Sequence, residues 1–272
     1  MGTSPAQDGQ SVAHSIGLRL GALACAQLQL AGQMLAQPGE ARHGGIHQAR
    51  KALRRVRAIL ALGRGRLGPR RRGLAAQIGR LGRGLSALRD AGALVETIER
   101  LKRSEAEIAI VFAASVVAAR SRRDALLERE LARDPALGRR CTRIAAWHTR
   151  LSRLPWAAVR QRTLRKALAR SLERVAQAQQ RTRAESATDE DWHLLRRRLR
   201  RLRQQHSVLE ELAPALLKDA PPSDQRAERL GEAQDDALLL ARCGARSPFP
   251  AALRPTLRQV ARRRLAQARS AD

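Results

Sequence analysis

Two segments of the chain place histidine and arginine at the same spacing. His47 begins the first segment and His193 begins the second, and the basic residues that follow stand at matching offsets: Arg50, Lys51, Arg54, Arg55 and Arg57 in the first, and Arg196, Arg197, Arg200, Arg201 and Arg203 in the second. On a helix these offsets cover an arc of roughly 160°. The opposite arc is apolar in both segments, with Ala49, Leu53, Val56 and Leu60 in the first and Leu195, Leu199, Leu202 and Leu209 in the second. Each segment therefore predicts a helix with one buried face and one cationic face.

This cationic face has the chemistry that phosphate requires. A guanidinium group presents a planar fork of donors to two phosphate oxygens and keeps its charge at any ordinary pH. The repeated offsets recur at about the helix pitch, so each helix can follow a chain of phosphates. A histidine among so many cations is expected to have a lowered pKa and to be neutral, until a bound phosphate favours its protonated form.

The overall charge supports a polyanionic partner. The 272 residues include 53 Lys and Arg against 25 Asp and Glu, which gives a net charge of +28 at pH 7. So many positively charged side chains repel one another unless a polyanion neutralises them. A basic face that is merely solvated or paired with nearby acids is the alternative, and the shortage of acidic residues argues against it. With two Phe, three Trp and no Tyr, the chain has few rings on which single-stranded bases could stack.

The cellular context is predicted from what the sequence lacks. The three cysteines form no CxxC pair, which favours a reducing compartment over a disulfide framework. The polar N-terminus has no signal-peptide pattern, and no apolar run approaches the ~18–20 residues of a membrane span. We therefore expect a cytoplasmic protein with no membrane partner, and the sequence makes no prediction of its oligomeric state.

Helical periodicity and capping signals predict an all-α protein in which residues 1–9 are disordered. Expected helices cover about 10–37, 46–62, 69–90 (or on to 103), 104–132, 136–154, 155–185, 188–214, 223–243 and 250–269. The shift of 146 residues between the two histidines extends downstream, where Asp90 in LSALRDAGAL stands opposite Asp235 in LGEAQDDALL at a shift of 145. We therefore expect two pseudo-symmetric four-helix bundles, 10–132 and 155–270, joined by a connector at 133–154.

These repeated motifs resemble the CHAD family, named for an α-helical domain with a characteristic histidine. The fingerprints are the two basic segments, the first followed by Arg89-Asp90 and the second by Asp235. The resemblance covers about residues 10–270. It implies an all-helical, non-catalytic domain that binds inorganic polyphosphate in a basic groove, needs no cofactor and associates with polyphosphate granules. Asp90 and Asp235 are then expected to pair with the motif arginines and hold them in place, with Arg89 as a further supporting residue.

Three other interpretations stay open at this point. A nucleic-acid-binding protein would use the same arginines on backbone phosphates, but an open basic face would suit a duplex better than a narrow groove. The spacings Glu40-x-x-His43 and Glu190-x-x-His193 match those of di-iron bundles, although neighbouring arginines would repel a metal ion. An enzyme acting on polyphosphate would need a catalytic motif, and neither a P-loop nor a G-x-S-x-G nor an H-E-x-x-H sequence occurs. We therefore expect no catalytic residues and no metal.

Overall fold

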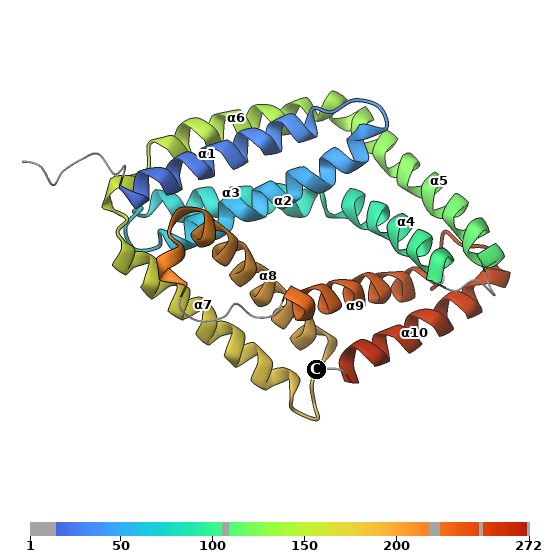
Figure 1. The fold of residues 1–272 in the computed structure, drawn as a ribbon. Helices are drawn as coiled ribbons and strands as arrows, with labels where there is room; N and C mark the ends of the chain where they lie inside the picture. The colour runs from blue at the N-terminus through green and yellow to red at the C-terminus, as the bar shows by residue number, and fades with distance from the viewer. Residues whose placement is uncertain (1–14, 105–108, 218–223, 245–246, 271–272) are drawn as a thin grey trace, which may run out of the picture.

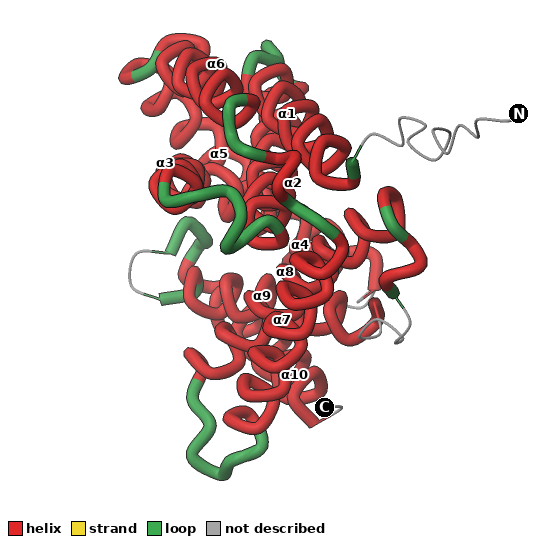
Figure 2. Tube along the Cα trace, turned by 90° about the vertical axis from the view of Figure 1, so that its left-hand side faces the viewer, coloured by secondary structure: helices red, strands yellow, loops and turns green. Residues whose placement is uncertain are grey.

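A computed structural model of the chain describes residues 15–104, 109–217, 224–244 and 247–270. Within these ranges the elements are ten α-helices and four short 3-10 helices, with no strand, as the all-α prediction requires. Figure 2 shows this helical composition along the described trace. The predicted disorder of residues 1–9 lies outside the described residues, as do residues 105–108 of the helix expected at 104–132.

The helices follow one another along the chain with short connections (Figure 1). They are α1 (Ile16–Leu35), α2 (Ala41–Leu62), α3 (Arg70–Gly84), α4 (Ser86–Ser104), α5 (Ala109–Arg133), η2 (Pro135–Leu137), α6 (Gly138–Ser152), η3 (Trp156–Ala158), α7 (Gln161–Thr182), α8 (Asp189–Leu212), η4 (Pro214–Leu216), α9 (Asp224–Arg242), η5 (Ala251–Leu253) and α10 (Arg254–Ser270). The two basic segments lie on α2 and α8.

The helix predicted from about Pro69 to Asp90 is in fact two helices. α3 ends at Gly84, Leu85 leaves helical geometry at φ −94° and ψ 4°, and α4 begins at once with Ser86. Gly82 and Gly84 weaken the last turn of α3, since glycine is the poorest helix former after proline. Leu85 is fully buried, so burial of this side chain holds the break in place.

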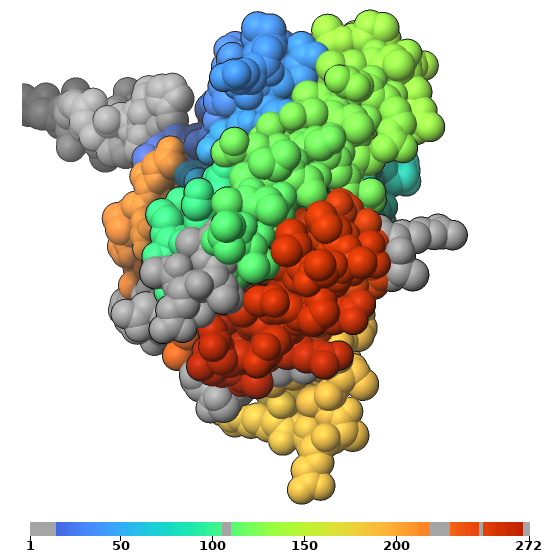
Figure 3. Space-filling model, turned by 90° about the vertical axis from the view of Figure 1, so that its right-hand side faces the viewer, coloured from blue at the N-terminus to red at the C-terminus, as the bar shows by residue number. Residues whose placement is uncertain are grey.

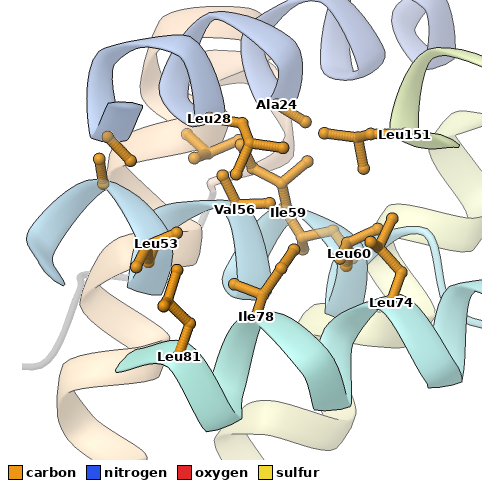
Figure 4. Close-up of a cluster of buried hydrophobic side chains, with 14 of the residues drawn as sticks. Ala24, Leu28, Leu53, Val56, Ile59, Leu60, Leu74, Ile78, Leu81 and Leu151 are labelled. Carbon is orange, nitrogen blue, oxygen red and sulfur yellow. The ribbon is translucent and has the colours of Figure 1, made fainter. Parts of the chain in front are cut away.

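The apolar faces predicted for the two motif helices form part of the core. All eight predicted residues are buried, from Ala49 to Leu60 on α2 and from Leu195 to Leu209 on α8. On α2 they meet residues of α1 and α3, as Figure 4 shows for Leu28, Val56 and Ile78. Burial of one face of each motif helix leaves the opposite, arginine-rich face available to a ligand.

The buried side chains form two clusters, and each cluster draws helices from both halves of the chain. The larger combines α1, α2 and α3 with α6, α7 and α8, whereas the smaller combines α4 and α5 with α9 and α10. Figure 3 shows α5 and α10 together on one face. Apolar packing therefore does not separate the chain into two bundles at 133–154, and the pseudo-symmetric repeat stays a prediction.

Candidate functional site

The two motif helices pack against each other and enclose a basic pocket. α2 contacts α8, and α4 contacts both α2 and α9. The resulting pocket has a volume of about 550 Å³ and includes ten of the predicted residues in its lining: Arg50, Arg54, Arg57, Arg89, Asp90, His193, Arg196, Arg197, Arg200 and Arg201. The structure thus brings most of both basic segments to one place.

The start of α8 is fixed by a capping box. The Thr188 hydroxyl accepts from the backbone N–H of Asp191 at 3.4 Å, and the Asp191 carboxylate accepts from the backbone N–H of Thr188 at 3.0 Å. These hydrogen bonds satisfy donors that the first turn would otherwise leave unpaired. They set where α8 begins, and so which turn presents each arginine to the pocket.

Five arginines of the pocket form no ion pair within the described part of the chain. Arg54, Arg57, Arg196, Arg200 and Arg201 form no ion pair or side-chain hydrogen bond with any described residue. All five are half-buried. A charged group that is withdrawn from water without a partner is costly, unless a ligand supplies the missing charge.

Burial and mutual repulsion lower the pKa values of these guanidinium groups. The pKa of Arg200 is lowered to about 9, first by burial and then by Arg54 and Arg196. Burial likewise lowers the pKa of Arg54 and of Arg201 to about 10, with neighbouring arginines contributing. Because these pKa values remain above neutrality, the groups are still charged at pH 7. The pocket therefore concentrates positive charge, and of the five arginines Arg196 is also attracted by the carboxylates of Asp235 and Asp90.

Other arginines of the site are held by the protein. Arg50 donates to the carbonyl oxygen of Gly82 and, at 3.0 Å, to the hydroxyl of Ser86. Arg89 lies between two carboxylates, 3.3 Å from Asp90 and 3.4 Å from Asp235. The two acids thus form their ion pairs with Arg89, and over a longer distance Asp90 also attracts Arg50 of α2 while both acids attract Arg196 of α8. Asp235 itself does not line the pocket.

The two motif histidines differ in position. His193 lines the pocket, and its Nδ1 lies 2.8 Å from Gln234 Oε1. This contact orients the imidazole ring of His193 at the wall of the pocket. His47 does not line the pocket. Its pKa is lowered, mainly by burial and also by Arg89, Arg54 and Lys51 against the opposing effect of Glu96, as predicted for a histidine among cations.

Three further predicted residues lie away from the pocket. Lys51 and Arg203 are exposed, and neither contributes to the lining. Arg55 points to α8, where it donates to Glu211 at 2.7 Å and to Ser207 at 3.3 Å. Its contact joins α2 to α8, so its position supports a structural role.

Several lining residues were not predicted from the sequence, namely Gly79, Gly82, Arg83, Ser86, Arg198, Gln204 and Gln234. The glycines of α3 were a usable signal, since a Cβ built at Gly79 would lie 3.2 Å from Cζ of Arg57. Gly79 thus lets the Arg57 guanidinium lie against α3. Arg198 has no basic counterpart in the first segment, where the matching position is Ala52. Comparison of the two segments therefore did not point to Arg198.

Comparison with known proteins identifies the family. A family model described as the CHAD domain matches residues 25–244. A search of curated proteins found no match, and neither did a search of solved structures. No helix among the described residues is long and apolar enough to cross a membrane.

Proposed function

Because the chain belongs to the CHAD family, we propose that it binds inorganic polyphosphate in the pocket between α2 and α8 without catalysing a reaction on it. The observation that carries this proposal is the group of five half-buried arginines that form no ion pair with a described residue. Phosphate oxygens would complete their hydrogen bonds and neutralise their charge together. A chain of phosphates would do so for successive helical turns of both motif helices.

The form of the site favours a bare phosphate chain over a nucleic acid. The unpaired guanidinium groups are half-buried inside a pocket of about 550 Å³. The phosphates of a duplex stand on a wide cylinder with its bases inside, and they would reach exposed arginines more readily than these. Binding to nucleic acid remains the second choice.

We propose that the protein does not catalyse a reaction because the pocket offers few acidic side chains. Asp90 is the one carboxylate among the described lining residues, and it is already paired with Arg89. Arg89 already holds this carboxylate, so the described lining offers no unpaired carboxylate to a metal ion or a substrate. We further propose that the protein is cytoplasmic and localises to polyphosphate granules, since both follow from polyphosphate as the ligand.

A competition titration at near-physiological salt tests the proposal. Labelled long-chain polyphosphate bound to the full chain is displaced by unlabelled polyphosphate, duplex DNA or RNA, each compared per phosphate. We expect polyphosphate to compete far better than either nucleic acid, because only a bare chain enters the pocket. Equal competition per phosphate would mean that net charge alone drives binding, and would overturn the assignment of the pocket.

A further inference from the structure

The basic pocket extends around α8 toward α7. Arg196 and Arg198 both line it, although they are two residues apart and therefore leave the helix about 200° from each other. α7 packs along α8 (Figure 1), and Val175 of α7 lies in the same buried cluster as Leu199 of α8. The lining thus includes more of α8 than the face that is turned to α2.

Two arginines of α7 lie beside this end of the pocket. Burial lowers the pKa of Arg198, and repulsion from nearby arginines adds to this effect, with Arg174 and Arg181 of α7 among them. Arg174 also repels Arg201, whose pKa is lowered first by burial. Neither arginine of α7 lines the pocket. The positive charge of the site therefore continues beyond its lining onto α7.

Arg174 and Arg198 keep their donors available to an anion. Both are half-buried, and neither forms an ion pair with a described residue. Glu173, the sequence neighbour of Arg174, is exposed and pairs with no described cation. Arg181 differs, since it is exposed and attracted by the carboxylate of Asp191. An anion held between Arg174 and Arg198 would offset the repulsion between them.

The pocket is open to solvent close to these two residues. Arg197 lines the pocket, and its side chain is 49% exposed. Arg83 of α3 is another exposed lining residue, so a long chain can pass through the pocket with both ends outside. Glu190 already contacts Arg197 at 3.3 Å. A chain that leaves on this side therefore meets Arg198 as the lining arginine without an ion pair.

We propose that Arg198 and Arg174 form a second phosphate-binding subsite, which holds the part of a long polyphosphate chain that leaves the pocket toward α7. The inference rests on the proposed function, because the same chain fills the pocket. A short polyphosphate is contained by the pocket and does not reach Arg174. The subsite therefore adds affinity for long chains alone.

The test titrates tripolyphosphate and long-chain polyphosphate into the full chain and into Arg174→Gln. Glutamine removes the charge and remains a good helix former. We expect the affinity for the long chain to fall about tenfold, because charge-assisted hydrogen bonds are lost, and the affinity for tripolyphosphate to stay within about twofold. The ratio of the two affinities is compared between proteins, because a long chain offers the same number of binding positions to each of them.

The matched control is Arg165→Gln, which removes the same charge from the same helix. Arg165 is nine residues from Arg174, about two and a half turns, and so lies on the opposite face of α7. It is exposed and does not line the pocket. We expect this variant to keep the wild-type ratio of affinities. Thermal unfolding without ligand shows that both variants are folded.

Two results would overturn the inference. One is a loss of long-chain affinity in Arg174→Gln that is no larger than the loss in Arg165→Gln. The other is an equal loss for both ligands in Arg174→Gln, which would mean that Arg174 supports the pocket and forms no separate subsite. Both results leave the proposed function intact, whereas a wild-type chain that binds neither ligand would reject the function and the subsite together.

Discussion

The arginines of the pocket combine a functional gain with a cost in stability. Arg200 is half-buried, makes no ion pair with a described residue and has a pKa lowered to about 9. Its charged form is therefore less stable in the folded chain than in water. Sites built for a charged ligand often carry such a penalty, which the bound ligand removes.

Replacing Arg200 is expected to stabilise the free protein and weaken binding. In Arg200→Met the desolvated charge is lost, and a long helix-forming side chain fills the space. We expect the free energy of unfolding to rise by about 1 kcal/mol, which corresponds to a melting temperature roughly 2–4 °C higher. Thermal unfolding without ligand measures this, and a lower melting temperature for the variant would contradict it.

His206 gives a prediction for the pH dependence of stability. This residue of α8 is 4% exposed, and neither ring nitrogen has a hydrogen-bond partner among the described residues. Burial lowers its pKa below the ordinary 6.5, against the smaller opposing effect of Glu210. As pH falls through 6.5, the unfolded chain takes up a proton that the folded chain resists, so this residue reduces the free energy of unfolding toward acid pH.

The substitution His206→Leu should therefore raise the melting temperature at pH 8, where it removes unpaired buried nitrogens. The gain should be larger at pH 5, where the proton penalty is removed as well. Thermal unfolding of both proteins at the two pH values gives the comparison. A gain that is equal at pH 5 and pH 8 would show that His206 does not contribute to the acid sensitivity.

At the scale of helices, the position of α2 depends on a close approach to α1. A Cβ built at Gly45 would lie 2.2 Å from the backbone oxygen of Met34. At the neighbouring Gly44, no atom from another described part of the chain lies within 4 Å of the corresponding position. Gly45 is thus the contact that lets α2 lie against α1 and present its arginines at the pocket.

These adjacent glycines provide a matched pair of substitutions. Gly45→Ala is expected to destabilise the fold by roughly 1–3 kcal/mol because backbone atoms must move apart. Gly44→Ala should instead stabilise it by up to ~1 kcal/mol, since alanine is the better helix former and nothing obstructs it. Denaturant unfolding of both variants measures the difference, and equal effects would show that the close approach is unimportant.

Periodicity predicted the motif helices well, because burial of one face is a local property of the sequence. The eight apolar residues expected to be buried on α2 and α8 are all buried. The break at Leu85 and the pairing of Arg55 with Glu211 were not predicted. Both depend on how distant segments pack, and local spacing carries no signal for that.

The sequence also did not predict which of the repeated residues line the pocket and which acids pair with Arg89. The two basic segments look equivalent in their spacing, yet His193 lines the pocket and His47 does not. Asp90 and Asp235 share one partner, Arg89, although they are 145 positions apart in the chain. Equal offsets on two helices predict which faces are basic, whereas only the crossing of the helices decides which residues converge.

At the scale of the whole molecule, the net charge of +28 gives salt two opposite effects on stability. Added salt should stabilise the free protein and should weaken the stabilisation that a bound ligand provides. Without ligand, added salt screens the repulsion among arginines, so the melting temperature should rise. Polyphosphate at about 100 times its Kd should stabilise the fold by about 2.7 kcal/mol.

With ligand held constant, the same addition of salt should reduce the stabilisation, because counterions compete for the arginines. Thermal unfolding over a sodium chloride series, with and without polyphosphate, measures both trends. Parallel trends in the two series would contradict this account of the charge.

The most direct test of the central claim separates the pocket from the net charge. The affinity for long-chain polyphosphate is measured for Arg54→Met with Arg200→Met, and for Arg143→Met with Arg153→Met as the control. Both pairs remove the same charge, but Arg143 and Arg153 are exposed and lie outside the pocket. We predict a loss of roughly 100-fold for the pocket pair, because each guanidinium makes charge-assisted hydrogen bonds with phosphate, and little change for the control pair. Equal losses for the two pairs would contradict the claim that this pocket binds the ligand.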